Sequence, residues 1–289
     1  MSKIEAINVK KVYDIRSTGK KTDPEDCIFT ALGGVNLKVE EGEFLVILGP
    51  SGCGKSTFLD IVAGLSEPDE GTIYIDGNPI TGPGLDRGIV FQQYALLPWR
   101  NALNNVTFPL ESKNIEKERR EEIARNYLSL VGLTGFEERY PYELSGGMKQ
   151  RVAIARALAI DPEVLLLDEP FAAVDAQTRE ILQTDLLNIT YDSNKTVIFI
   201  THSIDEAVFL ADRVAVMTAR PGVIKEIVDV TIPREKRFTD DIKSTADFVQ
   251  IRHKLWELLK EEVVKSQETC NKCSIDDCNL AHNKAEEVE

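Results

Sequence analysis

The stretch that decides the fold is Gly49-Pro50-Ser51-Gly52-Cys53-Gly54-Lys55-Ser56. It fits the pattern G-x-x-x-x-G-K-[ST], with an apolar run at 44–48 before it and a helix-forming segment at 55–65 after it. Its glycines let backbone N–H groups close around phosphate oxygens at a helix N-terminus, where the helix dipole adds partial positive charge. The stretch therefore predicts a phosphate-binding loop between a buried strand and a helix.

The side chains at the end of this loop predict how a nucleotide is held. Lys55 places a positive charge near the β- and γ-phosphates, and Ser56 is a predicted ligand of Mg²⁺. Thr57 follows directly and is placed to bond a phosphate through its hydroxyl and amide. Cys53 occupies a variable position of the pattern, so we interpret it as a small filler and not as a nucleophile.

A second acidic element follows another apolar run, in Val164-Leu165-Leu166-Leu167-Asp168-Glu169. Parallel strands of α/β sheets present their carboxyl ends to ligands, so both carboxylates are predicted at the ligand-binding edge. Asp168 is suited to hold Mg²⁺ through water, and Glu169 to orient or deprotonate an attacking water. An acidic pair closing a strand is common on its own. Together with the phosphate loop, it favours nucleotide hydrolysis.

A third element is Leu144-Ser145-Gly146-Gly147-Met148, at the start of a predicted helix over 148–158. A serine followed by two glycines at a helix N-terminus forms a second anion-binding cradle. One nucleotide does not need two such cradles from the same subunit. The element therefore indicates that a second subunit takes part in the site.

With these elements in this order, the sequence resembles the ATPases of ABC transporters. The resemblance covers about residues 3–220 and six motifs in family order. It implies that two copies pair head-to-tail and that each ATP lies between the phosphate loop of one copy and Ser145–Gly147 of the other. The fifth residue of the Ser-Gly-Gly signature is Met148 where many members have glutamine, but that position lies beyond the cradle.

The resemblance also assigns roles to four residues outside these motifs. Tyr13 corresponds to the aromatic residue that stacks on adenine, although an ordinary strand tyrosine stays an alternative because the loop 14–30 is longer than usual. Gln92 corresponds to the glutamine that contacts Mg²⁺ and senses the membrane partner. Asp175 corresponds to an aspartate that crosses the dimer interface, and His202 to the histidine that contacts the γ-phosphate.

The expected site is the sum of these residues. The predicted catalytic residues are Lys55, Glu169 and His202. The predicted nucleotide-binding residues are Tyr13, Gly49, Pro50, Ser51, Gly52, Cys53, Gly54, Lys55, Ser56, Thr57, Gln92, Ser145, Gly146, Gly147 and Asp175. The predicted Mg²⁺ ligands are Ser56, Gln92 and Asp168, and the predicted cofactors are ATP and Mg²⁺.

The expected fold class is α/β: a P-loop NTPase core with a mostly parallel sheet, an antiparallel β subdomain and a helical insertion subdomain. Continuous apolar runs favour buried parallel strands, whereas the alternation at 72–76 favours a half-exposed antiparallel strand. We expect an ATPase domain over 1–235, with its helical subdomain at about 100–160. A helical appendage is expected over 236–265, with an apolar stripe containing Phe248, Ile251, Leu255, Leu258 and Val263.

The charge balance limits the partners. The chain has 34 Lys and Arg against 48 Asp and Glu, a net charge of −14, which repels polyphosphate backbones and excludes nucleic acid as an expected partner. The start lacks the apolar segment of a secretory signal, and no apolar run approaches the ~18 residues of a membrane span. We therefore expect a peripheral protein on the cytoplasmic face of the membrane, held there by docking on a permease.

Three segments favour one branch of the family. Leu97-Pro98-Trp99, Leu144–Met148 and Ala219-Arg220-Pro221-Gly222 resemble the importers of nitrate, sulfonates and taurine. The implied partners are a transmembrane permease and, indirectly, an extracytoplasmic substrate-binding protein. The alternative is a soluble ABC ATPase acting on DNA or ribosomes, but those usually carry two modules or a long coiled-coil insertion, and this chain has neither. A third interpretation, a P-loop kinase, is not favoured because such an enzyme would not need the second anion-binding cradle at Ser145–Gly147.

The acidic tail over 266–289 lies outside the family resemblance. Cys270, Cys273, Cys278 and His282 offer four ligands within thirteen residues, a set suited to tetrahedral Zn²⁺. An iron–sulfur centre is a less favoured alternative. The remaining interpretation is an acidic tail that holds three cysteines without metal and cannot bury enough surface to fold alone.

Overall fold

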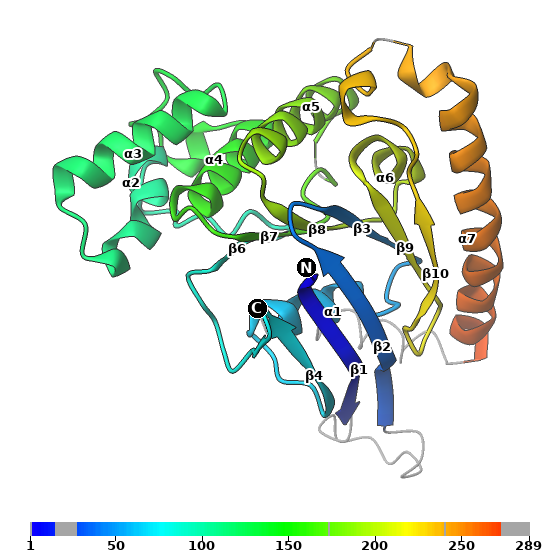
Figure 1. Ribbon diagram of the computed structural model, residues 1–289. Coiled ribbons are helices and arrows are strands. Elements are labelled where there is room, and N and C mark those ends of the chain that lie inside the picture. Colours follow the sequence, from blue (N-terminus) through cyan, green and yellow to red (C-terminus); the bar gives the residue numbers. More distant parts are fainter. Residues whose placement is uncertain (1, 15–27, 173, 240, 273–289) are drawn as a thin grey trace. The chain divides into compact units, whose positions relative to one another are not determined.

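The computed structural model describes residues 2–14, 28–172, 174–239 and 241–272 (Figure 1). These residues divide into two compact units. The first contains residues 40–45 and 82–200, and the second contains 2–39, 46–81 and the chain from 201 onward. Over the described ranges, no helix has both the length and the apolar character that crossing a bilayer requires.

The first unit is built on a parallel sheet with the strand order β6-β7-β8. In chain order its elements are β6 (Arg87–Val90), α2 (Ala102–Thr107), α3 (Lys117–Leu130), α4 (Gly146–Ala159), β7 (Val164–Asp168), α5 (Ala176–Asp192) and β8 (Thr196–Thr201), with 3-10 helices at Phe108–Lys113 and Pro141–Glu143. Leu166 of β7 lies between Ile89 and Ile198 of its neighbours, and β8 is buried along its whole length. The continuous apolar runs therefore form buried parallel strands, as predicted.

Three helices of this unit, α2, α3 and α4, pack against one another and form the predicted helical insertion (Figure 1). Asn101 caps α2 because its side chain accepts a hydrogen bond from the N–H of Asn104. The highly charged α3 buries Ala124 and Leu128, four residues apart on one face. Gly132 follows the end of α3 with a φ of +73°, which a glycine adopts at little cost. The charged segment at 117–130 therefore forms a helix with one buried face, inside the region where helices are expected.

The second unit contains an antiparallel sheet with the strand order β2-β1-β4-β5, and the strands β10, β9 and β3 in that order. Its elements are β1 (Ser2–Asp14), β2 (Ile28–Glu40), β3 (Phe44–Leu48, which begins in the first unit), α1 (Lys55–Ala63), β4 (Glu70–Ile75), β5 (Asn78–Pro79), α6 (Ile204–Leu210), β9 (Arg213–Met217), β10 (Ile224–Asp229) and α7 (Ala246–Lys272), with 3-10 helices at Arg234–Lys236 and Ile242–Ser244. Ile4 and Ala6 of β1 lie opposite Ile75 and Ile73 of β4, and all four are buried. The predicted antiparallel strand is confirmed.

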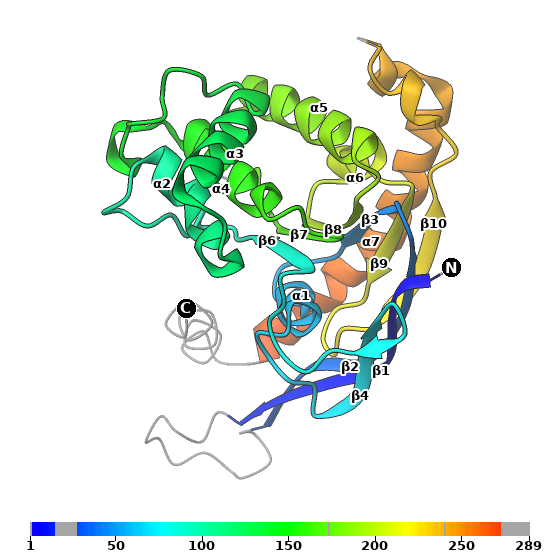
Figure 2. The same cartoon turned by 60° about the vertical axis from the view of Figure 1, so that its left-hand side comes forward.

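The C-terminal helix α7 packs against α6 and β9 (Figures 1 and 2). Phe248, Leu255 and Leu259 face inward and are almost fully buried. The prediction that Val263 continues this stripe is wrong, since its side chain is 37% exposed; the inward position is taken by Glu262, which is 1% exposed. The backbone of α7 also continues to Lys272, past the expected boundary at residue 265.

Glu262 is a charged residue buried at the end of an apolar stripe. Its carboxylate accepts hydrogen bonds from the N–H of Ala219 (3.0 Å), from Lys225 (2.9 Å) and from Lys265 (2.9 Å). Burial by itself raises the pKa of this carboxyl, but the hydrogen bonds outweigh it and lower the pKa from 4.5 to about 2. The carboxylate is therefore ionised in the folded protein at any pH near neutrality.

This low pKa predicts an acid-sensitive contribution to stability. The folded-state pKa lies below the unfolded value, so the stabilisation is fully present above pH 4.5 and is lost as the pH falls towards 2. Its size at pH 7 is on the order of 3 kcal/mol. Denaturant unfolding at pH 7 and pH 3 should show a difference between wild type and Glu262→Gln that shrinks at pH 3. A difference independent of pH would contradict this assignment.

Candidate functional site

The predicted phosphate loop joins β3 to α1 in the second unit, in the predicted strand–loop–helix order. Gly52 and Gly54 have φ values of +70° and +104°, which side-chain-bearing residues rarely adopt. A Cβ on Gly54 would lie 2.8 Å from the carbonyl oxygen of Ala31. Glycine is therefore required at position 54 both by conformation and by space, and the loop backbone is held tightly against β2.

Lys55 is the buried cation of this loop. Its side chain is 5% exposed, and Nζ donates hydrogen bonds to the carbonyl oxygens of Gly49 and Pro50, both at 3.0 Å. Ser56 is exposed and Thr57 is half-buried at the start of α1. The loop thus combines a helix N-terminus, an ammonium group and hydroxyl groups. The N–H groups and the ammonium fit a phosphate, and a hydroxyl oxygen fits its magnesium ion.

The environment of Cys53 fits the predicted filler role. The thiol is buried, and a Cβ on Gly49 would lie 2.9 Å from its Sγ. Burial raises the pKa of the Cys53 thiol, although the nearby Lys55 opposes this effect. A neutral, packed thiol is a poor nucleophile.

Tyr13 belongs to the second unit and lies on β1. It stacks on Phe29 of β2 with 6.3 Å between ring centroids, and the guanidinium of Arg220 lies 4.2 Å from the Phe29 ring centroid. Tyr13 is 41% exposed, so one part of its ring is open to a ligand. Sequence reasoning identified Tyr13 but missed Phe29, and it named Arg220 only as part of the segment 219–222.

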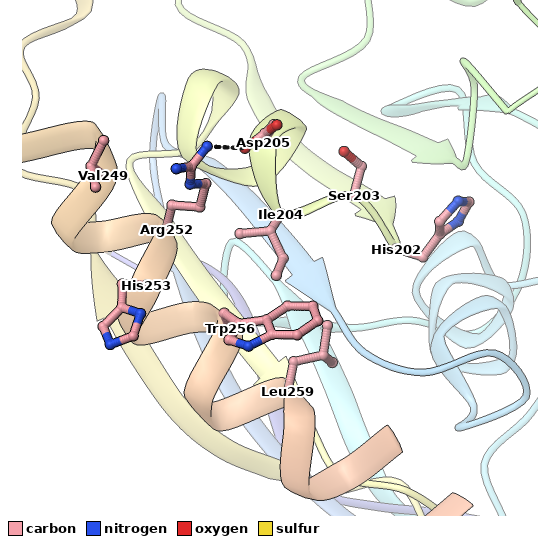
Figure 3. Close-up of a pocket in the computed structure, with 9 residues that line it drawn as sticks. All are labelled: His202, Ser203, Ile204, Asp205, Val249, Arg252, His253, Trp256 and Leu259. Carbon is pink, nitrogen blue, oxygen red and sulfur yellow. Dashed lines mark ion pairs between the residues drawn. The ribbon is translucent and has the colours of Figure 1, made fainter. Parts of the chain in front are cut away.

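His202 follows β8 and precedes α6, and its side chain is exposed. A pocket of about 510 Å³ opens between this segment and α7 (Figure 3). Its lining residues are His202, Ser203, Ile204, Asp205, Val249, Arg252, His253, Trp256 and Leu259. Arg252 and Asp205 face each other across it at 3.9 Å, and in Figure 3 His202 lies at the end remote from His253.

The acidic pair belongs to the first unit, at the carboxyl end of β7. Asp168 is the last residue of the strand, opposite Ile200 of β8. Glu169 follows with a left-handed φ of +39°, and its N–H donates to the carbonyl of Ile200 at 3.1 Å. Non-glycine residues in this conformation are strained and cluster at functional sites. Both carboxylates thus lie at the predicted end of the strand.

The Ser-Gly-Gly loop and Asp175 are brought together in the same unit. Ser145 caps α4, and its Oγ accepts from the N–H of Met148 at 3.3 Å. Asp175 caps α5, and the N–H of Thr178 donates to it at 3.0 Å; these hydrogen bonds from Thr178 lower the pKa of Asp175. A Cβ on Gly147 would lie only 2.8 Å from Cγ2 of Thr178. The N-terminal ends of α4 and α5 are therefore in contact at Gly147, whose missing side chain leaves space for that of Thr178.

This contact predicts that Gly147→Ala displaces the start of α4. Because a shift of ~1 Å in a binding group can cost up to 10²-fold, we expect ATP turnover to fall by about tenfold or more. The helix-favouring effect of alanine offsets part of the strain, so the melting temperature should change little. Gly82→Ala is the matched control, since a Cβ there meets no atom within 4 Å. Equal turnover of both variants would contradict the prediction.

Gln92 is exposed, and the segment after it has an unusual backbone. Tyr94 and Ala95 have φ values of +61° and +43°, and Arg156 of α4 donates hydrogen bonds to both of their carbonyl oxygens. Burial lowers the pKa of the Arg156 guanidinium. The helix that begins with the Ser-Gly-Gly loop thus holds the segment that follows Gln92, a link that the sequence did not reveal.

The predicted tail site cannot be placed. Cys270 lies in the last part of α7, where side chains are not described, and Cys273, Cys278 and His282 lie outside the described residues. In the part of the chain that is described, no group of three or more His, Cys, Asp or Glu side chains is arranged to hold a metal ion. The metal-binding tail stays a prediction.

Comparison with known proteins identifies the family. The family model for the ABC transporter matches residues 32–172. The ABC transporter ATP-binding protein MJ0412 of Methanocaldococcus jannaschii is 53% identical over 264 residues, which cover 91% of this chain and 94% of that protein. The chain belongs to the ABC transporter ATP-binding family. The resemblance seen in the sequence is confirmed.

Other relatives of this ABC protein have transport functions in their names. The nitrate import ATP-binding protein NrtD of Synechococcus elongatus is 50% identical over 72% of this chain and 78% of that protein. The bicarbonate transport ATP-binding protein CmpD of a Synechocystis species is 49% identical over 85% of each. A solved dimer of the cassette MJ0796 bound to ADP and Pi is 36% identical, with a TM-score of 0.68 and coverage of 80% of this chain and 100% of that chain. The predicted P-loop NTPase fold is confirmed, and the protein is an ABC-type ATPase.

Proposed function

We propose that this ABC ATPase is the energy-coupling subunit of an importer for a small anion such as nitrate, a sulfonate or taurine. The observation that carries the proposal is that about half of the aligned positions, over 72% and 85% of this chain, are identical to those of ATP-binding proteins of nitrate and bicarbonate transport. Nitrate and bicarbonate are both small oxyanions, which places bicarbonate among the candidate solutes. The solute itself is selected by other subunits.

The proposed nucleotide site uses the residues predicted from the motifs. Backbone N–H groups of residues 49–57 and the ammonium of Lys55 bind the phosphates, and Tyr13 stacks on the base. Ser56, Gln92 and Asp168 hold the magnesium ion, which when bound neutralises charge on the phosphates. Glu169 orients and deprotonates the attacking water, and His202 contacts the γ-phosphate. The buried ammonium of Lys55 supports this assignment, as does the backbone conformation of the loop, which requires glycine at positions 52 and 54.

We further propose that two copies close head-to-tail around ATP. Ser145, Gly146 and Gly147 of one copy would bind the γ-phosphate held by the phosphate loop of the other, and Asp175 would cross the interface. The two helix caps that meet at Gly147 support a shared role for this surface. The solved cassette MJ0796, which is dimeric, supports the pairing of two copies.

The proposed site of permease docking is the segment 94–99 on the first unit. Trp99 is 71% exposed, and tryptophan is enriched among the residues that carry most of the binding energy of protein interfaces. Docking there would hold the protein at the cytoplasmic face of the membrane. The net charge of −14 supports attachment through a protein, because anionic lipid repels an acidic surface.

The import proposal is tested by purifying the tagged full chain with its membrane partners and reconstituting the complex in vesicles. We expect an integral membrane permease to co-purify and ATP-dependent uptake of radiolabelled nitrate, bicarbonate or taurine. A binding protein for the solute is added in parallel samples, since importers need one to deliver the substrate. Recovery of ribosomes or DNA in place of a permease would overturn the import function.

Trp99→Ala provides a sharper test of the docking surface. Truncating a central aromatic residue of an interface typically costs ~2 kcal/mol or more, so we expect the affinity for the permease to fall by about 30-fold. The ATPase activity of the free subunit should be unchanged. Trp256→Ala on α7, where the tryptophan is also half-exposed, is the control. Loss of permease binding by the control alone would place the docking surface elsewhere.

A further inference from the structure

The buried stripe of the C-terminal helix α7 ends beside the loop that connects β9 to β10. Glu262 accepts a hydrogen bond from the N–H of Ala219, the second residue of that loop, at 3.0 Å. Lys225, at the start of β10, donates to Glu262 (2.9 Å), to Glu261 (2.6 Å) and to the carbonyl of Leu258 (3.2 Å). A buried carboxylate is stable only when its hydrogen bonds are satisfied, so this contact fixes the geometry of the loop relative to α7.

The loop from Thr218 to Val223 is closed by a hydrogen bond between its ends and is hydrogen-bonded to β2. The N–H of Thr218 donates to the carbonyl of Val223 at 2.9 Å. The N–H of Gly222 donates to Ala31 at 2.9 Å, and the carbonyl of Gly222 accepts from Gly33 at 3.0 Å. These bonds restrain the two ends of the loop and tie it to the neighbouring strand. A displacement at Ala219 is therefore transmitted to Arg220 and Gly222.

Two residues of this loop contact the phosphate loop directly. Nε of Arg220 donates to the carbonyl oxygen of Gly52 at 2.6 Å. A Cβ on Gly52 would lie 2.8 Å from the guanidinium of Arg220, and a Cβ on Gly222 would lie 2.2 Å from the carbonyl oxygen of Cys53. The backbone of the phosphate loop is therefore packed against this second loop without spare room.

From these contacts we propose that Glu262 is a positioning residue for nucleotide binding, acting through Ala219 and Arg220 on the backbone of the phosphate loop at Gly52. The C-terminal helix then does more than cover an apolar face. It sets the conformation in which the N–H groups of the phosphate loop meet ATP. This inference rests on the proposed function, in which residues 49–57 bind the phosphates of the nucleotide.

The test measures nucleotide affinity, kcat, KM and melting temperature of the full chain. For Glu262→Ala we expect Mg-ATP to bind about tenfold more weakly and KM to rise by a similar factor, with kcat little changed. Glu262→Gln keeps an acceptor for the N–H of Ala219 and should restore most of the affinity. Glu261→Gln is the matched control, since Glu261 contacts the same Lys225 but not Ala219; it should bind Mg-ATP like wild type.

A double-mutant cycle separates positioning from stability. Arg220→Met removes the bond to Gly52, so adding Glu262→Ala to it should cause no further loss of affinity. Independent, multiplying effects on affinity would overturn the inference, as would a Glu262→Ala variant that melts earlier but binds Mg-ATP like wild type. Lys55→Met distinguishes failure of the proposed nucleotide site from failure of the positioning role of Glu262. If Lys55→Met leaves Mg-ATP binding intact, the proposed nucleotide site is wrong. If Lys55→Met abolishes binding while Glu262→Ala has no effect, only the positioning role of Glu262 is wrong.

Discussion

Glu169→Gln is expected to bind ATP normally and to lose almost all turnover. Glutamine keeps the size and the hydrogen-bonding reach of the side chain but cannot take a proton from water. A well-placed general base contributes ~10²-fold or more to a rate, so kcat should fall by at least 100-fold. Because hydrolysis is what reopens the proposed ATP-bound dimer, the variant should accumulate as a stable dimer in ATP. Steady-state turnover and size-exclusion chromatography in ATP measure the two effects.

The control for this variant is Glu163→Gln. Glu163 is exposed and precedes β7, at the end opposite Glu169. Its replacement by glutamine therefore removes one negative charge in the same way, but outside the proposed site. It should hydrolyse ATP like wild type and return to the same oligomeric state. Unchanged turnover of Glu169→Gln would exclude Glu169 as the base. The strained φ of +39° at this position would then need a different explanation.

The core of the fold was predictable because each of its signals is local. A continuous apolar run such as 164–167 favours a strand covered on both faces, and the glycine pattern at 49–56 marks the loop between a strand and a helix. The half-exposed strand at 72–76 was equally plain from its alternation. Such signals need no knowledge of what lies elsewhere in the chain.

What the sequence did not reveal are contacts between segments far apart in the chain. Arg156, which belongs to no quoted motif, donates to the carbonyls of residues 94 and 95. Arg220 donates to the carbonyl of Gly52, a contact that its segment 219–222 does not predict. The inward face of α7 was misjudged at one turn because an apolar stripe predicts Val263, whereas the cations at positions 225 and 265 make it favourable to bury Glu262. Side-chain partners of this kind depend on tertiary placement, which periodicity does not encode.

Lys55→Met is expected to abolish useful binding of ATP while leaving the protein folded. Methionine matches the length of the lysine stem, so packing at this buried position is kept. The variant loses the ammonium that bonds the carbonyls of Gly49 and Pro50 and that would meet the β- and γ-phosphates. A charge-assisted hydrogen bond to an anion contributes about 1.5–3 kcal/mol, so Mg-ATP affinity should fall by about 100-fold. Equilibrium binding of Mg-ATP and thermal unfolding measure affinity and folding separately.

Lys10→Met is the matched control for this substitution. Lys10 lies on β1 in the same unit and forms an ion pair with Glu70 at 2.7 Å on the surface, where such pairs contribute ~1 kcal/mol or less. It should bind Mg-ATP like wild type and melt at nearly the same temperature. The affinity of Lys55→Met should also lose much of its dependence on salt concentration, because one cation fewer faces the phosphates. An affinity within threefold of wild type would show that the ammonium of Lys55 does not meet the phosphates, and would overturn the proposed nucleotide site.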